Sequence, residues 1–261
     1  MILPQMEQAA LYNAINQDLT ILGRENRTVY SNAVAAYACP SDPASGRARE
    51  AEPKLLDDLG LADPGERIPM VFTSYSAAFG SLYVNALPRP EGGCVVAGRL
   101  KSQADGAFVD LTATRLADIR DGLNQTLFAS EKACTLFQRL DKIAPGLSSR
   151  RGWWITGNWG DTLMTAMYPP NMFDKVAAAA GDAHAFAASS LHPGGVNALF
   201  GDGSVRFVKD TIQSWPFDPI TGSPQGASRN LGGWWDDLPR PGLWQVLATR
   251  SGGEVVDAGG F

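Results

Sequence analysis

Two residues of this chain stand at a spacing that suggests chemistry: His192 and, after nine intervening residues, Asp202, which Gly203 follows. A histidine and an aspartate can act together as metal ligands or as an acid–base pair. The segment between them, however, predicts a β-hairpin, because alternating apolar residues flank a Gly-Asp-Gly turn on both sides. Since strand residues are spaced about 3.3 Å apart, we expect the hairpin to keep the two side chains apart.

The hairpin hypothesis gives both motif residues a structural role. We expect the His192 imidazole to hydrogen-bond the loop at its own end of the hairpin. The Asp202 carboxylate should accept N–H groups of its own turn, and Gly203 should supply the positive φ that a tight turn needs. A short helix capped by Asp210 and Thr211 is expected to follow.

Motifs and composition exclude several classes of function. The sequence has no Gly-x-Ser-x-Gly nucleophile motif and no glycine-rich nucleotide-binding loop, so we do not expect an enzyme. The formal net charge of −5 argues against a nucleic-acid-binding protein, which normally carries a basic face. No segment approaches the roughly 18 consecutive apolar residues that a membrane span needs.

Carboxylate-rich loops near the C-terminus are the candidate metal sites. Hard cations such as calcium prefer oxygen ligands, although the sequence has no EF-hand spacing. The candidate ligands of a structural calcium ion are Asp218, Asp236 and Asp237. We expect no other cofactor.

All seven tryptophans lie beyond residue 150, and four of them form two adjacent pairs, Trp153–Trp154 and Trp234–Trp235. These pairs could form a surface that stacks on a glycan or docks a protein. Neighbouring residues of an extended segment point to opposite sides of the backbone. The alternative is therefore that half of these rings lie in the core and half contact a partner.

Three cysteines, Cys39, Cys94 and Cys134, allow one disulfide with one cysteine left over. The alternative is that all three are small buried hydrophobic residues. No C-x-x-C spacing is present, which excludes a zinc ribbon.

Hydrophobic periodicity predicts the main elements of one globular domain over residues 1–261. The 28 glycines and 17 prolines favour many turns over a helical bundle. Helices are expected over residues 4–19, 133–143, 176–188 and 243–250, and strands over residues 70–78 and 126–132.

Several words of the sequence resemble a large bacterial family of prepilin-like proteins of unknown function, similar to type IV pilins and pseudopilins. The H-x9-D-G signature is present from His192 to Gly203, and residues 39–43 read Cys-Pro-Ser-Asp-Pro. Residues 2–16, 114–127 and 244–256 are also similar to segments of that family. The resemblance implies an α+β, pilin-like fold in which an N-terminal helix packs on an antiparallel sheet, with long Gly/Pro-rich insertions.

The same resemblance implies a function. It suggests a non-enzymatic structural subunit of an extracytoplasmic or cell-surface assembly, which self-associates or binds other pilin-like subunits. The alternative is a Trp-rich binding module for a glycan or a protein partner. The family begins with a prepilin leader and a hydrophobic helix, neither of which is found here, so we expect a processed, truncated or stalkless form. In the family, the residue equivalent to Cys39 could pair with a cysteine of that N-terminal segment.

Overall fold

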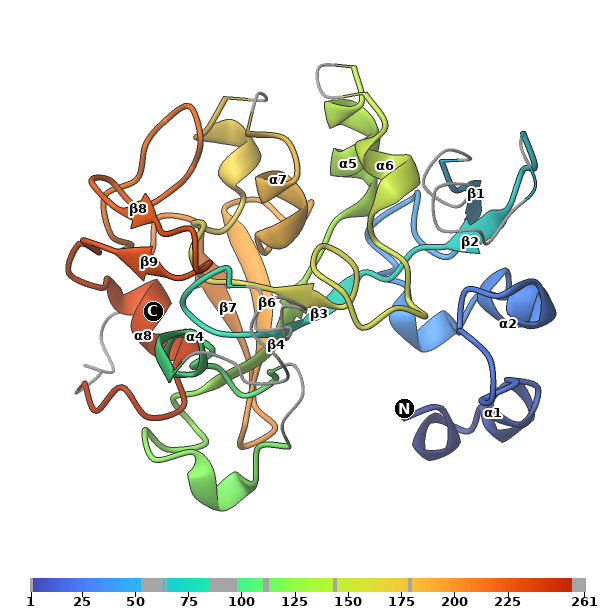
Figure 1. Ribbon diagram of the computed structural model, residues 1–261, viewed down its shortest axis with the longest axis horizontal. Helices are drawn as coiled ribbons and strands as arrows, with labels where there is room; N and C mark the ends of the chain where they lie inside the picture. The colour runs from blue at the N-terminus through green and yellow to red at the C-terminus, as the bar shows by residue number, and fades with distance from the viewer. Residues whose placement is uncertain are drawn as a thin grey trace.

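The structure is a computed structural model in which a central sheet is surrounded by short helices and long connections (Figure 1). The N-terminal elements gather on the right of Figure 1, and the C-terminal elements lie on the left. No helix within the described part of the chain is both long and apolar enough to cross a lipid bilayer. The residues that the structure describes are 2–52, 63, 65–84, 98–109, 113–142, 145–177 and 180–254.

The central sheet has five strands. They are β3 (Tyr75–Ala78), β4 (Leu127–Glu131), β5 (Leu163–Met164), β6 (Gly195–Phe200) and β7 (Val205–Lys209). Their order across the sheet is β5-β3-β4-β6-β7, and every neighbouring pair is antiparallel except β3 and β5, which run parallel. The α+β class predicted from the sequence is therefore confirmed.

The predicted hairpin is present as β6 and β7. Its turn residue Gly203 has a φ of +85°, and the Asp202 carboxylate accepts the backbone N–H of Ser204 at 2.9 Å. Both residues therefore have the turn roles expected of them. The helix expected after Asp210 and Thr211 is wrong, because these two residues form a turn and residues 212–216 contain no helix. The Lys175 ammonium donates to the Asp210 carbonyl in this turn.

The N-terminal region does not form the long helix predicted over residues 4–19. A 3₁₀ helix, η1 (Leu3–Met6), and a short α-helix, α1 (Ala9–Asn13), take its place. Between them Glu7 has a φ of +59°, and a left-handed residue breaks the right-handed helical path. The apolar stripe of this segment therefore belongs to two short helices.

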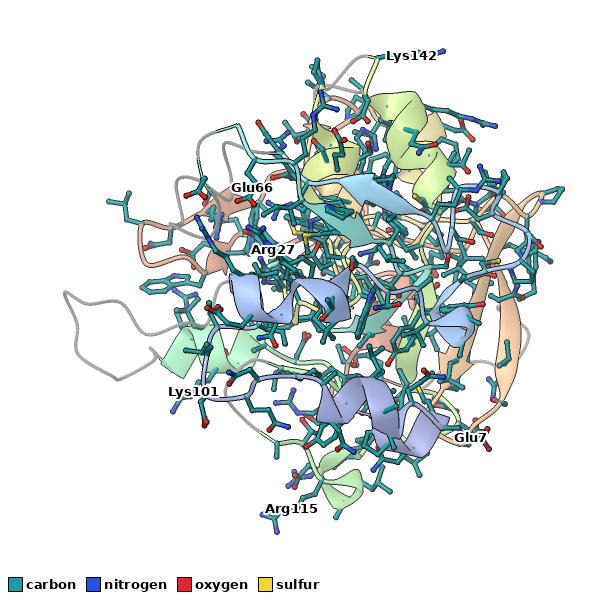
Figure 2. All side chains as sticks on the ribbon, turned by 90° about the vertical axis from the view of Figure 1, so that its right-hand side faces the viewer. Glu7, Arg27, Glu66, Lys101, Arg115 and Lys142 are labelled. Carbon is teal, nitrogen blue, oxygen red and sulfur yellow. The ribbon has the colours of Figure 1, made fainter. Side chains whose placement is uncertain are left out.

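These N-terminal helices pack in a hydrophobic cluster of their own. Leu3 and Ile15 join the residues of α2 (Arg27–Tyr30) and of a two-stranded sheet formed by β1 (Ala48–Glu50) and β2 (Pro69–Val71). The Arg27 guanidinium pairs with the Glu66 carboxylate and lowers its pKa to about 2 (Figure 2). The N-terminal helices thus pack with β2, whereas the pilin-like expectation placed a helix on the main sheet.

Two of the other predicted helices are confirmed, as α5 (Cys134–Leu140) and α8 (Leu243–Ala248). Residues 176–188 contain only one helical turn, α7 (Ala183–Phe186). The other short elements are η2 (Arg24–Asn26), η3 (Ala35–Tyr37), α4 (Gly98–Gln103), η5 (Leu116–Asp118), α6 (Leu147–Arg150), η6 (Met172–Asp174), β8 (Ser228–Arg229) and β9 (Trp235–Asp236).

Helix α8 covers one face of the central sheet, which we call the inner face. Its Trp244 is fully buried and donates its indole N–H to the Tyr168 carbonyl at 2.9 Å. The neighbouring Gln245 amide is also buried, and it donates to the Ala166 carbonyl at 2.7 Å. The inner-face residues packed with Trp244 are Val196, Ala198, Phe200 and Val208.

Cys39 and Cys134 are buried free thiols. This agrees with the alternative that the cysteines act as small buried hydrophobic residues. Burial raises the pKa of Cys134 to about 12, so this thiol stays protonated. Cys94 lies outside the described residues.

Asp105 joins the end of β3 to the loop after α4. Its carboxylate accepts the backbone N–H of Ser81 at 2.8 Å and the Ser81 hydroxyl at 2.5 Å. Although part of the residue reaches the surface, its carboxyl group is enclosed, and burial raises its pKa to about 6. Ionisation of this group therefore opposes folding.

We expect Asp105→Asn to raise the free energy of unfolding by about 2 kcal/mol at pH 8 and by much less at pH 4. A carboxyl whose pKa rises on folding from 3.8 to about 6 stabilises the fold below pH 3.8, and this contribution is lost as the pH rises through 6. The amide oxygen still accepts the Ser81 N–H, the amide NH2 donates to the Ser81 hydroxyl, and the group does not titrate. Urea unfolding of both proteins at pH 4, 6 and 8 measures the difference, and a difference independent of pH would contradict the prediction.

Candidate functional site

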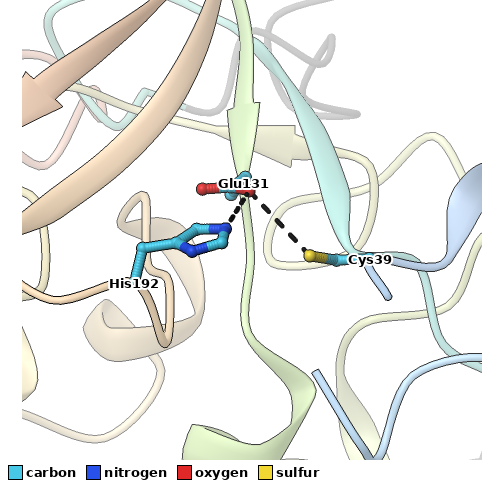
Figure 3. A group of neighbouring side chains, drawn as sticks. All are labelled: Cys39, Glu131 and His192. Carbon is cyan, nitrogen blue, oxygen red and sulfur yellow. Dashed lines mark hydrogen bonds and ion pairs between the residues drawn. The ribbon is translucent and has the colours of Figure 1, made fainter. Parts of the chain in front are cut away.

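Three side chains from distant parts of the sequence meet at the end of β4: Cys39, Glu131 and His192 (Figure 3). The His192 Nε2 lies 3.2 Å from the Glu131 Oε1, and the Cys39 Sγ lies 3.9 Å from the same oxygen. All three ligand-type atoms lie within 4.8 Å of one another. Cys39 and Glu131 are buried, and His192 is partly exposed.

Glu131 is the centre of this cluster because it is the last residue of β4. Its Oε2 accepts the backbone N–H of Asn197 on β6 at 2.7 Å, and its Oε1 accepts the Asn197 side-chain amide at 3.1 Å. The carboxylate thus continues the link between β4 and β6 beyond the last paired residue, Ser130. This double contact fixes the position of the carboxylate in the sheet.

Cys39 is positioned by the Cys-Pro-Ser-Asp turn that follows η3. The Ser45 hydroxyl donates to the Cys39 carbonyl at 2.7 Å, and the Asp42 N–H donates to the same oxygen at 3.1 Å. The Asp42 carboxylate in turn accepts the N–H and the hydroxyl of Thr135 in the first turn of α5. A carboxylate at this place caps the helix, so the turn is tied to the element that follows β4.

His192 is positioned by the loop that precedes β6. Its backbone N–H donates to the Ser190 hydroxyl at 3.1 Å, and the Ser190 N–H donates to the Asn171 side-chain oxygen at 2.8 Å. Ser189, one residue earlier, donates its N–H to the Glu131 carbonyl at 3.0 Å. The loop that carries His192 is therefore fixed to the same strand end as the other two residues.

The order of the three groups decides which chemistry they suit. In a nucleophilic Cys–His pair the imidazole must contact the thiol to take its proton. Here the carboxylate contacts both other groups, and the imidazole lies on Glu131. One sulfur, one oxygen and one nitrogen donor within 4.8 Å of one another are instead a set that transition metals use.

Lys132, the residue after Glu131, serves a different part of the molecule. Its Nζ donates to the Asp161 carbonyl at 2.6 Å, and the Asp161 carboxylate accepts the N–H groups of Gly152 and Trp153 at 2.7 and 3.1 Å. Burial lowers the pKa of Lys132 to about 7 and raises that of Asp161. This pair ties β4 to the loop over residues 152–161 and adds no group to the Cys39 cluster.

A comparison with protein-family models identifies the family of the chain. The model described as "Protein of unknown function (DUF1559)" matches residues 1–214. The chain belongs to this family. Comparison with curated proteins and with solved structures gave no match. The DUF1559 match includes all three residues of the cluster, and it ends before α8.

In this DUF1559 chain the two residues of the H-x9-D-G spacing have separate partners. His192 lies before β6 and contacts Glu131, whereas Asp202 lies after β6 and contacts Ser204. The expectation that the hairpin keeps them apart is confirmed. The expectation that the imidazole bonds its own loop is wrong, because the ring reaches the carboxylate of the neighbouring strand β4.

The three aspartates proposed as calcium ligands do not meet. The Asp218 carboxylate accepts the N–H groups of Ile220 and Thr221, both at 2.8 Å, as in an ordinary Asx turn. Asp236 forms an ion pair with Arg99 at 2.8 Å. Asp237 follows with a φ of +56°. Within the described residues, these carboxylates belong to no group of three candidate ligands.

The tryptophan pairs are mostly part of the core. Trp153, Trp154 and Trp235 are buried, and only Trp234 keeps a partly exposed ring, beneath the Arg99 guanidinium. The expectation that the four residues form a stacking surface is therefore wrong, because only Trp234 is accessible. Both members of the first pair are buried because they pack in the hydrophobic cluster that contains residues of β2 and of the N-terminal helices.

Sequence reasoning missed Glu131 and did not connect Cys39 with His192. The available signal was that Cys39 and His192 each lie in a word shared with the family, so a common site was a natural hypothesis. Glu131 lies in no such word, and only the pairing of β4 with β6 reveals it.

Proposed function

We propose that the chain is a non-enzymatic structural subunit of an extracytoplasmic or cell-surface assembly. It associates with further copies, or with related pilin-like subunits, through the face of the central sheet opposite α8. We call this the outer face. The observation that carries the proposal is that large apolar side chains on the outer face are exposed: Val205 by 65%, Phe207 by 44% and Leu199 by 37%.

Strand register places these side chains on one face. Leu199 pairs with Val205 and Asn197 pairs with Phe207, so all four point to the same side of the hairpin. The register between β4 and β6 adds Ala129 opposite Leu199. This side continues across β4 to β3, where Tyr75 pairs with Glu131. The outer face therefore spans four strands, from β7 to β3.

Two aromatic rings pack against glycines of the hairpin. The Phe207 ring covers Gly195, where a Cβ atom would come within 2.9 Å of the ring. Phe128 covers Gly201 in the same way and packs edge-to-face on Phe108, with ring centroids 5.5 Å apart. These contacts hold the exposed rings in place, and rigid apolar side chains are favourable in interfaces because little rotamer freedom is lost on binding.

The hairpin also lies at the edge of the sheet. β7 pairs only with β6 in the described part of the chain, and in Figure 2 the two strands stand at the right-hand side of the molecule. Exposed edge strands with apolar side chains are prone to associate with another chain. Soluble monomers normally avoid this combination, which supports an assembly role over a freely diffusing one.

We expect Val205→Lys to abolish concentration-dependent association of the chain, because a charge placed on the most exposed apolar side chain of the outer face must be desolvated on association. Sedimentation equilibrium over a range of concentrations measures the effect. Ile220→Lys is the matched control, since Ile220 is 61% exposed but lies in a turn that is not part of the central sheet. Association should persist in this control.

Two outcomes would overturn the assembly proposal. One is a wild-type chain that stays monomeric at every concentration and also binds no extracytoplasmic pilin-like subunit. The other is a Val205→Lys variant that associates as strongly as the wild type. Circular dichroism of both variants verifies that the sheet is intact.

A further inference from the structure

We infer that Cys39, Glu131 and His192 form a binding site for one divalent transition metal ion of the zinc class. The inference depends on the position of three donor atoms and not on the assembly role of the outer face. The three side chains supply one thiolate, one carboxylate and one imidazole, a mixture typical of zinc sites with an open position.

The measured separations fit a tetrahedral ion. Zinc–nitrogen and zinc–oxygen bonds of about 2.0 to 2.1 Å hold two such ligands about 3.3 Å apart in tetrahedral geometry. The His192 Nε2 and the Glu131 Oε1 are 3.2 Å apart. A sulfur ligand at about 2.3 Å from the ion lies about 3.5 Å from an oxygen ligand, and the Cys39 Sγ is 3.9 Å from the Glu131 Oε1. The third separation, between the Cys39 Sγ and the His192 Nε2, is at most 4.8 Å. An ion would therefore draw the Cys39 side chain closer to the other two ligands.

Charge and burial also favour a cation. With the Cys39 thiol deprotonated, the thiolate and the Glu131 carboxylate carry two negative charges in a buried place, and a divalent ion neutralises both. On binding, the thiol proton goes to solvent. The imidazole keeps one proton, which moves to Nδ1 so that Nε2 is free to ligate. The carboxylate retains its Oε2 bond to the Asn197 N–H, which orients the ligating oxygen.

The fourth ligand would be a water molecule. A cavity of about 10 Å³, the lower limit for a single water molecule, borders Cys39 and Glu131 but not His192. Ser189 and Ser190 also line it and can hydrogen-bond a water there. The ion would then have three protein ligands and one water.

Hydrogen bonds tie down the segment of each ligand before a metal binds. Ser45 bonds the Cys39 carbonyl, Ser190 accepts the His192 backbone N–H, and Asn197 of β6 bonds the Glu131 carboxylate itself. These segments come from three separate parts of the chain, so the ion would connect the turn after η3, the end of β4 and the loop before β6. A bound ion should therefore stabilise the fold as well as occupy the site.

Titration of the reduced full-length chain with Zn²⁺ by isothermal calorimetry tests the inference. We expect one ion per chain and a rise in melting temperature on binding. Cys39→Ser and His192→Gln should each weaken binding on the order of 100-fold or more, since each removes a direct ligand. Glu131 is not substituted in this test, because its carboxylate also accepts the Asn197 N–H of β6 and its loss would disturb the sheet.

Two control variants separate the site from unspecific effects. Cys134→Ala removes the other described thiol, and Asp202→Asn alters the other half of the H-x9-D-G spacing. Both should bind zinc as the wild type does. With Co²⁺ as a spectroscopic probe, we expect intense tetrahedral d–d bands and a thiolate charge-transfer band that is lost in Cys39→Ser. A wild type that binds no zinc, or zinc affinity unchanged in Cys39→Ser and His192→Gln, would overturn the site.

Discussion

Trp244→Ala is expected to lower the free energy of unfolding by about 3–5 kcal/mol, the usual cost of removing a buried aromatic side chain. Trp244 is fully buried between α8 and the inner face of the central sheet. The substitution leaves a cavity beside Val196 and Val208, and it leaves the Tyr168 carbonyl without its indole donor. Chemical unfolding followed by circular dichroism measures the change.

Two further variants show which part of the loss comes from packing. Trp244→Phe keeps most of the apolar volume but loses the bond to Tyr168, so we expect it to cost about 2 kcal/mol. Ile220→Ala removes an exposed apolar side chain and should change stability by less than about 0.5 kcal/mol. A Trp244→Ala protein as stable as the wild type would contradict the docking of α8 on the inner face.

The importance of α8 follows from the asymmetry of the sheet. On the inner face, apolar residues of β6 and β7 pack under Trp244 and Leu247. On the outer face, Leu199 and Phe207 of the same strands are exposed. Loss of α8 packing would expose the inner face as well. We therefore expect the Trp244→Ala protein to aggregate more readily than the wild type.

The hairpin could be predicted from the sequence because its determinants are local. Alternating apolar residues fix the faces of β6 and β7, and Asp202 and Gly203 suit a turn whatever surrounds it. The strand β4 and helices α5 and α8 were likewise predicted from short periodic segments. These elements need little information from distant residues.

The N-terminal helix and the cluster at β4 could not be predicted in this way. The apolar spacing of residues 4–19 suits one helix, but the left-handed Glu7 shows that packing against β2 outweighs local propensity there. The contacts of Glu131 span 92 residues to Cys39 and 61 residues to His192. No spacing rule relates such distant positions, because they meet only when the sheet has formed.

The same dependence on distant contacts makes Gly152 sensitive. Gly152 has a φ of +94°, and a Cβ atom there would overlap the ring carbons of Phe72. That ring cannot move freely, since it packs edge-to-face on Phe137 at 5.2 Å and lies under the Arg49 guanidinium at 4.6 Å. The Gly152 carbonyl also accepts the Thr73 N–H at 2.8 Å, which fixes the backbone on the other side.

Gly152→Ala is therefore expected to lower the free energy of unfolding by about 3–5 kcal/mol, as the sum of left-handed strain and overpacking. Gly157→Ala is the matched control in the same loop, because no atom lies within 4 Å of its built Cβ and its φ is not left-handed. It should change stability by less than about 0.5 kcal/mol.

A double-mutant cycle with Phe72→Leu identifies the cause of the loss. The smaller side chain creates space, so Phe72→Leu should cost less in the Gly152→Ala protein than in the wild type, and the difference measures the steric part. Left-handed strain at residue 152 remains in both. If the two substitutions were simply additive, the overlap with Phe72 would not be the origin of the loss, and the strain of the backbone alone would have to account for it.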